Sequence, residues 1–289
     1  MCAVASGAAG SLGDSLGQNL SEAWGKPIIV ENAPGAAGIV AAEKVAKSAP
    51  DGYTLGMPGD APMTTNVTLY GKLPYDPLRD FAHITIVAET MNLLVVHPSV
   101  PAKNVQELIA LAKSQPGKLN YATAGSGTSQ HLGGEMMKSM AGVDVLHIPY
   151  KSAIQGIQSV LSGEVTMTFG NVVTALPYVR DGRLRALAVT SSKRSLEAPD
   201  VPTMAQAGLP DFEAVAWFGL VAPAGTPPAI LAKWHKETLR VLAQPEVRSK
   251  IAGLGAVIVG NSSEAFTSQI KAEIESKGEV IRATGAKPD

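Results

Sequence analysis

Two glycine-rich segments contain the residues of this sequence best suited to chemistry. Ser6–Ser11 reads SGAAGS and Ala124–Ser129 reads AGSGTS, and each precedes a segment with the apolar spacing of a helix. The first turn of a helix has backbone N–H groups without intrahelical partners and carries the positive end of the helix dipole. Because small residues let an anionic oxygen approach those donors, both segments are predicted to bind an anion.

The side chains of these segments favour a carboxylate over a phosphate. Neither segment contains Lys or Arg. Phosphate sites usually include a cation, whereas a carboxylate can be held by amides, hydroxyls and bridging water. Either segment alone could equally be a tight turn that needs small residues for its bend. The presence of two matched segments in different parts of the chain favours the anion interpretation.

Other chemistries fit the sequence poorly. The run Gly125-Ser126-Gly127 is followed by Gln130 where a dinucleotide-binding fingerprint has its third glycine. A hydrolase nucleophile elbow needs glycine two residues before and after its serine, but Ser126 has Ala124 and Thr128 there. No two histidines have the spacing that places metal ligands on one helix face; they are His83, His97, His131, His147 and His235. We therefore predict no catalytic residue, no metal and no cofactor.

Three single polar residues each allow a functional and a structural interpretation. His131, in the first turn after the second glycine-rich segment, either reaches a ligand or makes a local hydrogen bond. Asp60 is either a solvated turn residue or the partner of a ligand amine or hydroxyl. Asn171 either faces a ligand at the end of a strand or caps the following helix.

Hydrophobic periodicity gives the elements that must position these residues. Leu12, Leu16, Leu20 and Trp24 recur every four residues and form one face of a helix. Helices and strands then alternate along the chain, which predicts an α/β fold with parallel sheets. The expected helices are 11–24, 39–47, 105–114, 129–140, 153–161 and 174–180, and two more follow residue 226. The expected strands are 27–31, 53–57, 84–88, 93–97, 119–122, 144–148, 165–169, 184–190 and 216–222.

The order of these elements predicts two α/β lobes. Pro98 and Pro101 follow two apolar strands and mark a crossing between domains, and the strand 216–222 crosses back. We expect a discontinuous first lobe of residues 1–98 and 222–289 and a continuous second lobe of residues 99–221. Two hinge strands would join them, with the ligand cleft between the lobes.

Composition excludes several classes of protein. The chain has 289 residues, 45% hydrophobic and 17% charged, which is sufficient for two folded domains. A net charge of −1 provides no basic field for nucleic acid. Apolar runs such as Leu93–Val96 are too short for a membrane span, and no secretory signal pattern precedes the first glycine-rich segment. The single cysteine, Cys2, cannot form an internal disulfide.

Several longer motifs, taken in order, resemble the Bug family, the solute receptors of tripartite tricarboxylate transporters. They cover nearly the whole chain and are far more specific than either glycine-rich segment. The motifs are IVENAPGAAG at 29–38, APDGYTL at 49–55, LPYDP at 73–77 with DF at 80–81, YATAGSG at 121–127, IPYK at 148–151, LRALAVT at 184–190 and APAGTP at 222–227.

The resemblance implies a type II periplasmic binding fold that closes like a Venus flytrap. It implies a monomeric periplasmic receptor, without cofactor or catalysis, that delivers a small carboxylate to the membrane subunits of a tripartite tricarboxylate transporter. That carboxylate could be a dicarboxylate, a tricarboxylate, an amino acid or an aromatic acid. The family's ligand residues fall on Ser6, Gly7, Ala8, Ala9, Gly10, Ser11, Gly59, Asp60, Ala61, Thr123, Ser126, Gly127, Thr128, Ser129, His131, Tyr150, Phe169 and Asn171.

One departure from the family pattern concerns the first strand. Members usually begin with an apolar strand that ends in Pro-Phe or Pro-Tyr, whereas only residues 1–5 precede Ser6 here. We therefore expect a truncated or altered first strand, which would cost the first lobe sheet hydrogen bonds. Two alternatives stay open at this point: a hydrolase that uses the same cleft, and a solute-sensing partner of a signalling receptor.

Overall fold

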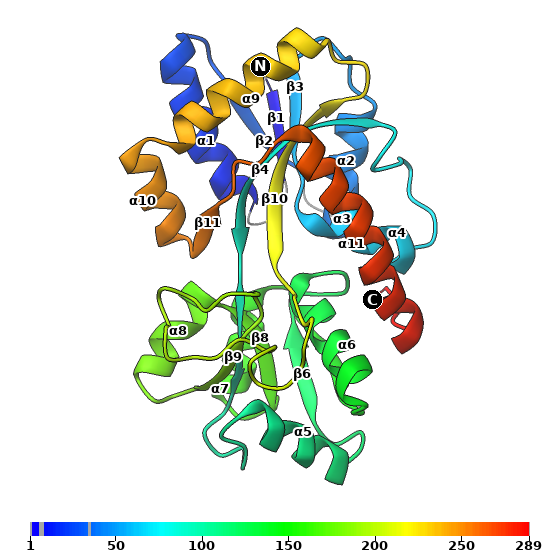
Figure 1. Cartoon of the computed structure of the whole chain (residues 1–289), viewed down its shortest axis with the longest axis vertical. Coiled ribbons are helices and arrows are strands. Elements are labelled where there is room, and N and C mark those ends of the chain that lie inside the picture. The colour runs from blue at the N-terminus through cyan, green and yellow to red at the C-terminus, as the bar shows by residue number, and fades with distance from the viewer. Residues whose placement is uncertain (1, 6–8, 34–35, 289) are drawn as a thin grey trace. The chain divides into compact units, whose positions relative to one another are not determined.

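The computed structural model describes residues 2–5, 9–33 and 36–288, and the chain divides into two compact units (Figure 1). The first unit is Met1–Glu89 with Ala216–Gly278, and the second is Thr90–Val215 with Glu279–Asp289. Each unit contains one sheet. The fold is therefore mixed α/β with two sheets.

The unit boundaries differ from the predicted ones. The sequence placed the first crossing after Pro98, but it lies between Glu89 and Thr90, because the strand that follows pairs only within the second sheet. The sequence also assigned the whole C-terminal part to the first lobe. The structure instead groups residues 279–289 with the second unit, so the chain passes from one unit to the other three times.

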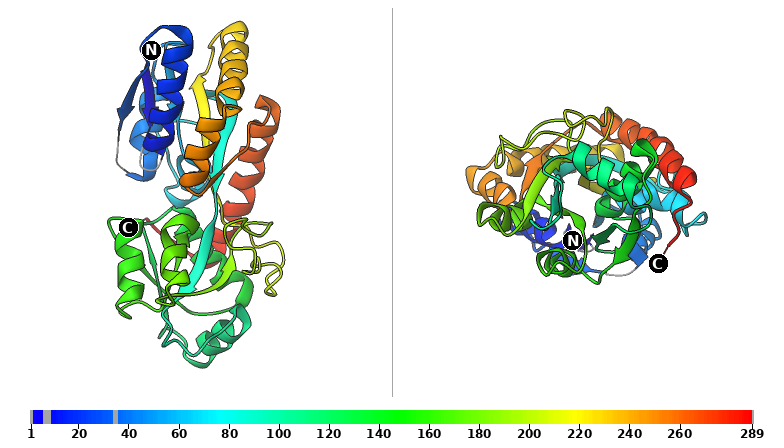
Figure 2. Two further views of the ribbon diagram at one scale, coloured as in Figure 1. Left: turned by 90° about the vertical axis from the view of Figure 1, so that its left-hand side faces the viewer. Right: turned by 90° about the horizontal axis from the view of Figure 1, so that it is seen from below.

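The first unit has a six-stranded sheet in the order β11-β4-β10-β3-β1-β2. Its helices lie on both faces of the sheet (Figure 2). Its strands are β1 Cys2–Ala5, β2 Ile29–Asn32, β3 Thr54–Met57, β4 Phe81–Thr90, β10 Ala216–Pro223 and β11 Ala256–Ile258. Its helices are α1 Ala9–Trp24, the 3₁₀ turn η1 Ala36–Gly38, α2 Ile39–Ala46, α3 Asp60–Met63, α4 Thr65–Leu69, α9 Pro228–Leu242, α10 Pro245–Gly253 and most of α11 Ser263–Thr284.

The first strand is present, contrary to the expectation of truncation. β1 pairs in parallel with both β2 and β3, in a register that matches Cys2 with Ile29 and with Thr54. All three strands have four residues, so β1 is as long as the neighbours it must pair with. The predicted loss of sheet hydrogen bonds therefore does not occur.

Alternation along β10 explains how the first sheet supports two cores. Trp217 and Val221 pack on one face with Phe266 of α11, while Phe218 and Leu220 pack on the other with the leucine stripe of α1. Gly219 lies on the α11 face, where an added Cβ would overlap the Phe266 ring. The glycine therefore lets α11 approach the sheet closely.

The second unit has a five-stranded sheet in the order β7-β6-β8-β5-β9, with cores on both faces. β6 is parallel to β7 and β8, and β5 is antiparallel to β8 and β9. Its strands are β5 Asn92–Val96, β6 Asn120–Thr123, β7 Leu146–Pro149, β8 Met167–Asn171 and β9 Arg185–Val189. Its helices are α5 Val105–Ser114, α6 Ser129–Ala141, α7 Ala153–Leu161 and α8 Val172–Arg180.

Replacing Gly134 tests how closely α6 packs on the second sheet. An added Cβ there would overlap the ring of Tyr121, which is fully buried and held by a hydrogen bond from its hydroxyl to Glu135. We expect Gly134→Ala to lower the free energy of unfolding by about 1–3 kcal/mol, since overpacking outweighs the better helix propensity of alanine. Urea unfolding followed by circular dichroism measures the change. Gly253→Ala, with no atom within 4 Å, is the control and should be neutral or slightly stabilising.

Candidate functional site

The loop between β6 and α6 is the best-defined candidate for anion binding. It follows the carboxyl end of a parallel strand, the edge at which α/β sheets present ligand-binding groups. Gly125 and Gly127 have φ values of 107° and 84°, a region that favours glycine. Thr128 then caps α6, because its Oγ1 accepts a hydrogen bond of 3.3 Å from the backbone N–H of His131.

Side chains occupy three backbone N–H groups of this loop. The N–H of Ala124 donates to Gln130 Oε1 at 2.7 Å, and that of Gly125 donates to Thr123 Oγ1 at 3.0 Å. The N–H of Gly127 donates to His131 Nδ1 at 3.1 Å. These three amides therefore hold the loop in shape instead of facing a ligand. The loop is pre-formed, which lowers the cost of ordering it on binding.

A different set of amides remains for an anion. In the described part of the chain, the backbone N–H groups of Thr128, Ser129 and Gln130 have no hydrogen-bond partner. They belong to the cap and first turn of α6, where the helix dipole also favours negative charge. Ser129 Oγ accepts a hydrogen bond of 3.0 Å from Asn92 Nδ2, so its own hydroxyl hydrogen can still be donated. A carboxylate is well suited to this set of donors.

His131 supports the loop from within the protein. Its side chain is almost fully buried, and Nδ1 accepts from Gly127, so the proton of the neutral ring lies on Nε2, 3.9 Å from Glu135 Oε1. The local hydrogen bond is thus the interpretation that the structure supports. The ring lies 4.4 Å from that of His147, whose Nε2 is 2.6 Å from Thr123 Oγ1. Sequence reasoning missed this role of His147.

A buried carboxylate lies beneath the same loop. Glu135 is 1% exposed and accepts hydrogen bonds from the Tyr121 hydroxyl at 2.7 Å and from Lys138 Nζ at 2.9 Å. Burial alone would raise the pKa of Glu135. Hydrogen bonds from Thr284, Lys138 and Tyr121 outweigh burial and lower the pKa below its usual value. The carboxylate is therefore an ionised structural group.

Asp60 is buried and paired within the protein. It is 5% exposed, so the prediction of a solvated turn residue is wrong, and its carboxylate binds Lys277 Nζ at 2.9 Å. Its other role, as the partner of a ligand amine or hydroxyl, stays a prediction. Lys277 also binds Glu273 at 2.8 Å, and Glu273 accepts from Trp217 Nε1. Burial would lower the pKa of Lys277, but the two carboxylates outweigh it and raise the pKa above its usual value. No local pattern could have indicated this pair, since Asp60 and Lys277 are 217 positions apart.

The remaining predicted ligand residues lie in different environments: some are buried, one caps a helix and some lie outside the described residues. The side chain of Phe169 is fully buried in the core against Phe212, so only its backbone is left for the predicted ligand contact. Asn171 caps α8 by accepting from the N–H of Val173 at 3.0 Å. Ser126 Oγ donates to the carbonyl of Lys287 at 3.2 Å. In the first unit Gly59 forms a bridge with Phe218, and Ala61 lies in α3. Ser6, Gly7 and Ala8 lie outside the described residues, and Ala9, Gly10 and Ser11 open α1.

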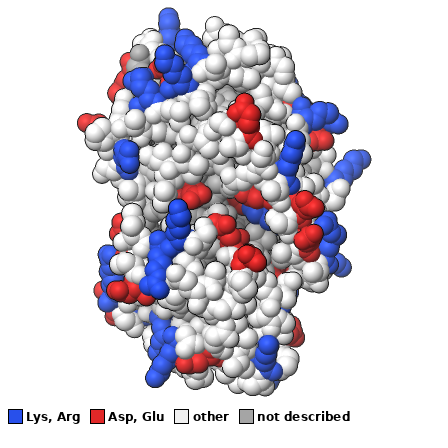
Figure 3. Space-filling view, viewed as in Figure 1, with Lys and Arg blue, Asp and Glu red and all other residues white. Residues whose placement is uncertain are grey.

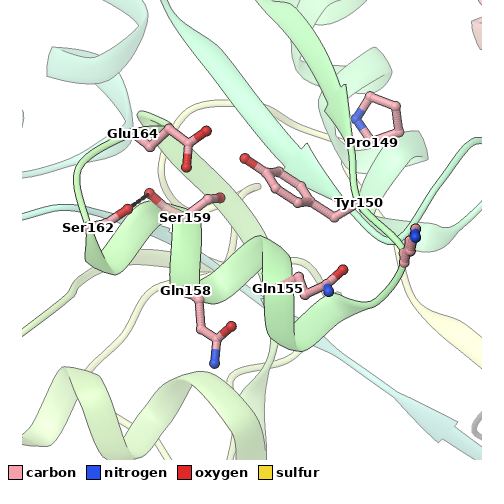
Figure 4. A pocket seen from close by; sticks show the side chains of 8 residues that line it. Pro149, Tyr150, Gln155, Gln158, Ser159, Ser162 and Glu164 are labelled. Atoms are coloured by element: carbon pink, nitrogen blue, oxygen red, sulfur yellow. Dashed lines mark hydrogen bonds between the residues drawn. The ribbon is translucent and has the colours of Figure 1, made fainter.

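Tyr150 lines a pocket on the α7 side of the second sheet, with a volume of about 570 Å³ (Figure 4). Its backbone N–H donates to Thr123, and its ring points toward Ser159 and Glu164. Glu164 places a carboxylate on the pocket wall, and a bound carboxylate would be repelled by it. This pocket is therefore less suited to an anion than the first turn of α6.

Three buried side-chain oxygens in the described part of the first unit have no hydrogen-bond partner: two lie together in α4, and the third, Thr238 Oγ1, lies in α9. Thr65 Oγ1 and Asn66 Oδ1, in α4, are buried and make no hydrogen bond in the described structure. Such atoms are uncommon in folded proteins and mark places where a ligand or water is accommodated. They lie directly after α3, which begins at Asp60. Sequence reasoning passed over both residues because they lie in an irregular stretch without a recognisable motif.

Neither a metal site nor a membrane-spanning helix is recognisable in the described residues. Within 2–5, 9–33 and 36–288, no group of three or more His, Cys, Asp or Glu side chains is arranged to hold a metal ion. Of the helices in those ranges, none combines the length and apolar character needed to cross a bilayer.

Comparison with known proteins gives one consistent result. Residues 14–286 match the protein family described as the tripartite tricarboxylate transporter family receptor. The chain is 34% identical to BugT of Bordetella pertussis over 273 residues, which cover 94% of this chain and 84% of BugT. It is similar to the Rhodopseudomonas palustris protein Rpa4515 solved with adipate, with 31% identity, a TM-score of 0.88 and coverage of 100% and 98% of the two chains. MatC of Rhodopseudomonas palustris, solved with malate, has 30% identity, a TM-score of 0.84 and coverage of 97% and 99%.

Removing Lys277 tests the buried ion pair. Lys277→Met leaves the Asp60 and Glu273 carboxylates without their cation, and we expect a loss of about 3–5 kcal/mol in the free energy of unfolding. Asp60→Asn added to Lys277→Met should recover part of that loss, because it removes one uncompensated charge. Lys271→Met, at an exposed position of the same helix, is the control. Equal unfolding curves for the Lys277 and Lys271 variants would contradict a stabilising ion pair.

Acid should weaken the second unit through Glu135. Its pKa is below the ordinary value of 4.5, so the stability it contributes is present above that value and is lost as the pH falls through the lowered pKa. We expect the wild-type protein to lose more stability between pH 6 and pH 3 than Glu135→Gln does. Urea unfolding at several pH values measures both slopes. Parallel curves would show that Glu135 has the same pKa in the folded and unfolded states.

Proposed function

The chain belongs to the tripartite tricarboxylate transporter receptor family, and we propose that it binds a small dicarboxylate outside the cytoplasm for delivery to the membrane subunits of such a transporter. The proposal includes no chemical step. It is supported by the family match and by the relatives solved with adipate and malate, both of which are dicarboxylates.

The observation that carries the proposal is the set of unpaired amides at the start of α6. Thr128, Ser129 and Gln130 offer three N–H donors on a loop that Thr123, Gln130 and His131 already hold in shape. These donors can bind one carboxylate without a cation. Other groups must then read the rest of the ligand, because amides alone do not distinguish one acid from another.

The position of Asp60 narrows the class of ligand. The sequence left open an amino or hydroxy acid whose amine or hydroxyl would pair with Asp60. Since Lys277 already pairs with that carboxylate, Asp60 gives no reason to expect an amine. A plain dicarboxylate therefore becomes the first choice. The hydrolase alternative is not favoured either, because the Ser129 hydroxyl is bonded by Asn92 and His131 Nδ1 accepts from Gly127.

Substituting Ser129 by proline tests the role of a single backbone amide. Proline suits the first position of a helix, and Thr128 already has the extended conformation, φ −67° and ψ 159°, that a residue before proline prefers. Ser129→Pro removes the N–H and the hydroxyl, whereas Ser129→Ala removes only the hydroxyl. We expect Ser129→Pro to bind the ligand at least about ten-fold more weakly than Ser129→Ala, because it loses one more charge-assisted hydrogen bond.

The ligand for this comparison comes from a thermal-shift panel of mono-, di- and tricarboxylates, amino acids and aromatic acids, followed by calorimetry. A shift with dicarboxylates is the expected result. A cooperatively melting protein that no carboxylate stabilises would overturn the proposed function. Equal affinities of the two Ser129 variants would refute only the assignment of the anion to α6.

A further inference from the structure

We propose that a second pocket, in the first unit, is the docking site for the transporter: it takes an apolar or aromatic side chain flanked by acidic residues from a loop of a membrane subunit. The inference rests on the proposed function, because it needs a transporter partner. We call this the aromatic pocket; its volume is about 530 Å³, and its lining includes Trp24, Lys26, Tyr53, Ile230, Lys233 and Trp234. Tyr53 and two further lining residues, Asp51 and Gly52, belong to the motif APDGYTL, to which the carboxylate site gives no role.

Three elements build the aromatic pocket. Trp24 ends α1, Tyr53 precedes β3, and Trp234 lies in α9. The two indole rings are 4.6 Å apart, and Trp234 is 4% exposed with its Nε1 donating to the carbonyl of Gly52 at 3.2 Å. Gly52 itself allows Ile230 to approach, because an added Cβ there would crowd that side chain. The floor of the pocket is therefore fixed by packing.

Tyr53 is the exposed part of this pocket. It is 65% exposed, an unusual degree for a large aromatic side chain that is connected to a fixed aromatic floor. Tyrosine and tryptophan are the residue types most enriched among the side chains that dominate protein interfaces. A solvent-exposed tyrosine beside two packed tryptophans therefore has the composition of an interface hot spot.

The aromatic pocket lies at the edge of the sheet opposite to the carboxylate segments. It adjoins the start of β3, whereas segments 6–11 and 59–61 follow the ends of β1 and β3, which run parallel. Four residues of strand separate the two edges by roughly 13 Å. A protein bound in the aromatic pocket would thus leave the ligand-binding edge of the first unit unobstructed.

Charge selects the kind of partner. Lys26 and Lys233 line the pocket, and the Lys233 ammonium lies 5.1 Å from the centre of the Trp24 ring. Its one lining acid, Asp51, accepts from the N–H of Tyr53 and is oriented into the turn. Lys and Arg side chains also gather on the surface over the end of α1 and the adjoining part of α9 (Figure 3). Glu237, which accepts from Trp24 Nε1 at 3.4 Å and binds Arg240, is also nearby. The two lysines beside an apolar floor fit an acidic segment with an apolar anchor.

The concave shape argues for a protein over a lipid surface. Aromatic residues that anchor a protein to a bilayer must project into it, whereas Trp24 and Trp234 line the floor of a hollow that encloses an incoming side chain. Binding to protein-free vesicles is therefore a separate outcome of the experiment.

The experiment uses the full chain with the membrane subunits of its transporter in proteoliposomes. Replacing Tyr53 by the photoreactive residue p-benzoyl-phenylalanine should give a crosslink to a membrane subunit, whereas the same replacement at Val257, 48% exposed on β11, should not. Tyr53→Ala and the double variant Lys26→Glu, Lys233→Glu should each raise the receptor concentration for half-maximal transport at least about ten-fold. Lys250→Glu, exposed on α10, is the charge control.

Carboxylate binding by the same variants separates the two proposals. We expect the docking variants to keep the carboxylate affinity of the wild type. A wild-type receptor that binds no carboxylate would refute the proposed function, and the Tyr53 crosslink would still report on docking. Unchanged transport by the Tyr53 and lysine variants, with no crosslink, would overturn the docking site. So would binding of the wild type to vesicles of phosphatidylcholine and phosphatidylglycerol that the double lysine variant loses, since that result would assign the pocket to lipid.

Discussion

This receptor depends most on the hydrogen bonds that three side chains accept from backbone N–H groups of the loop before α6. An anion site made of backbone amides needs glycine, because Cβ atoms and ordinary φ values would keep the loop from its shape, but glycine also makes a loop costly to order. Thr123, Gln130 and His131 resolve this conflict by each accepting one backbone N–H. The amides left unpaired are those of the first turn of α6, where the helix dipole adds to their effect.

A buried ion pair supports residues 59–61 of the first unit. Lys277 lies between the carboxylates of Asp60 and Glu273 and ties α11 to the start of α3. A buried ion pair of this kind is weak evidence for net stability, because desolvation offsets much of the attraction. The ion pair instead fixes a position. Because α3 is a single short turn, its contact with α11 determines where residues 59–61 lie. Supporting groups are thus as important to the site as the residues that would touch a ligand.

Local patterns in the sequence predicted local structure well. The bounds of α5 and α7 were predicted to the residue, since each has an apolar period and a capping side chain, Asn104 and Ser152. The loop at residues 124–129 was found from its glycines and the helix after it. Long-range pairings were missed: Lys277 is 217 positions from Asp60, and His147 supports Thr123 from the neighbouring strand. The burial of the Phe169 side chain was not predicted, because alternation assigns strand residues to two faces without showing which face is the core.

The use of main-chain amides has a consequence for selectivity. Every residue type offers the same N–H, so an anchor made of amides binds any carboxylate and cannot by itself distinguish one acid from another. Discrimination between acids must come from side chains that contact the rest of the ligand. It can also come from buried polar atoms, because a ligand that leaves them unpaired loses binding free energy. In the described chain, Thr65 Oγ1 and Asn66 Oδ1 are buried polar atoms of that kind in the first unit. An acid that reached and satisfied such atoms would gain affinity over one that left them unpaired.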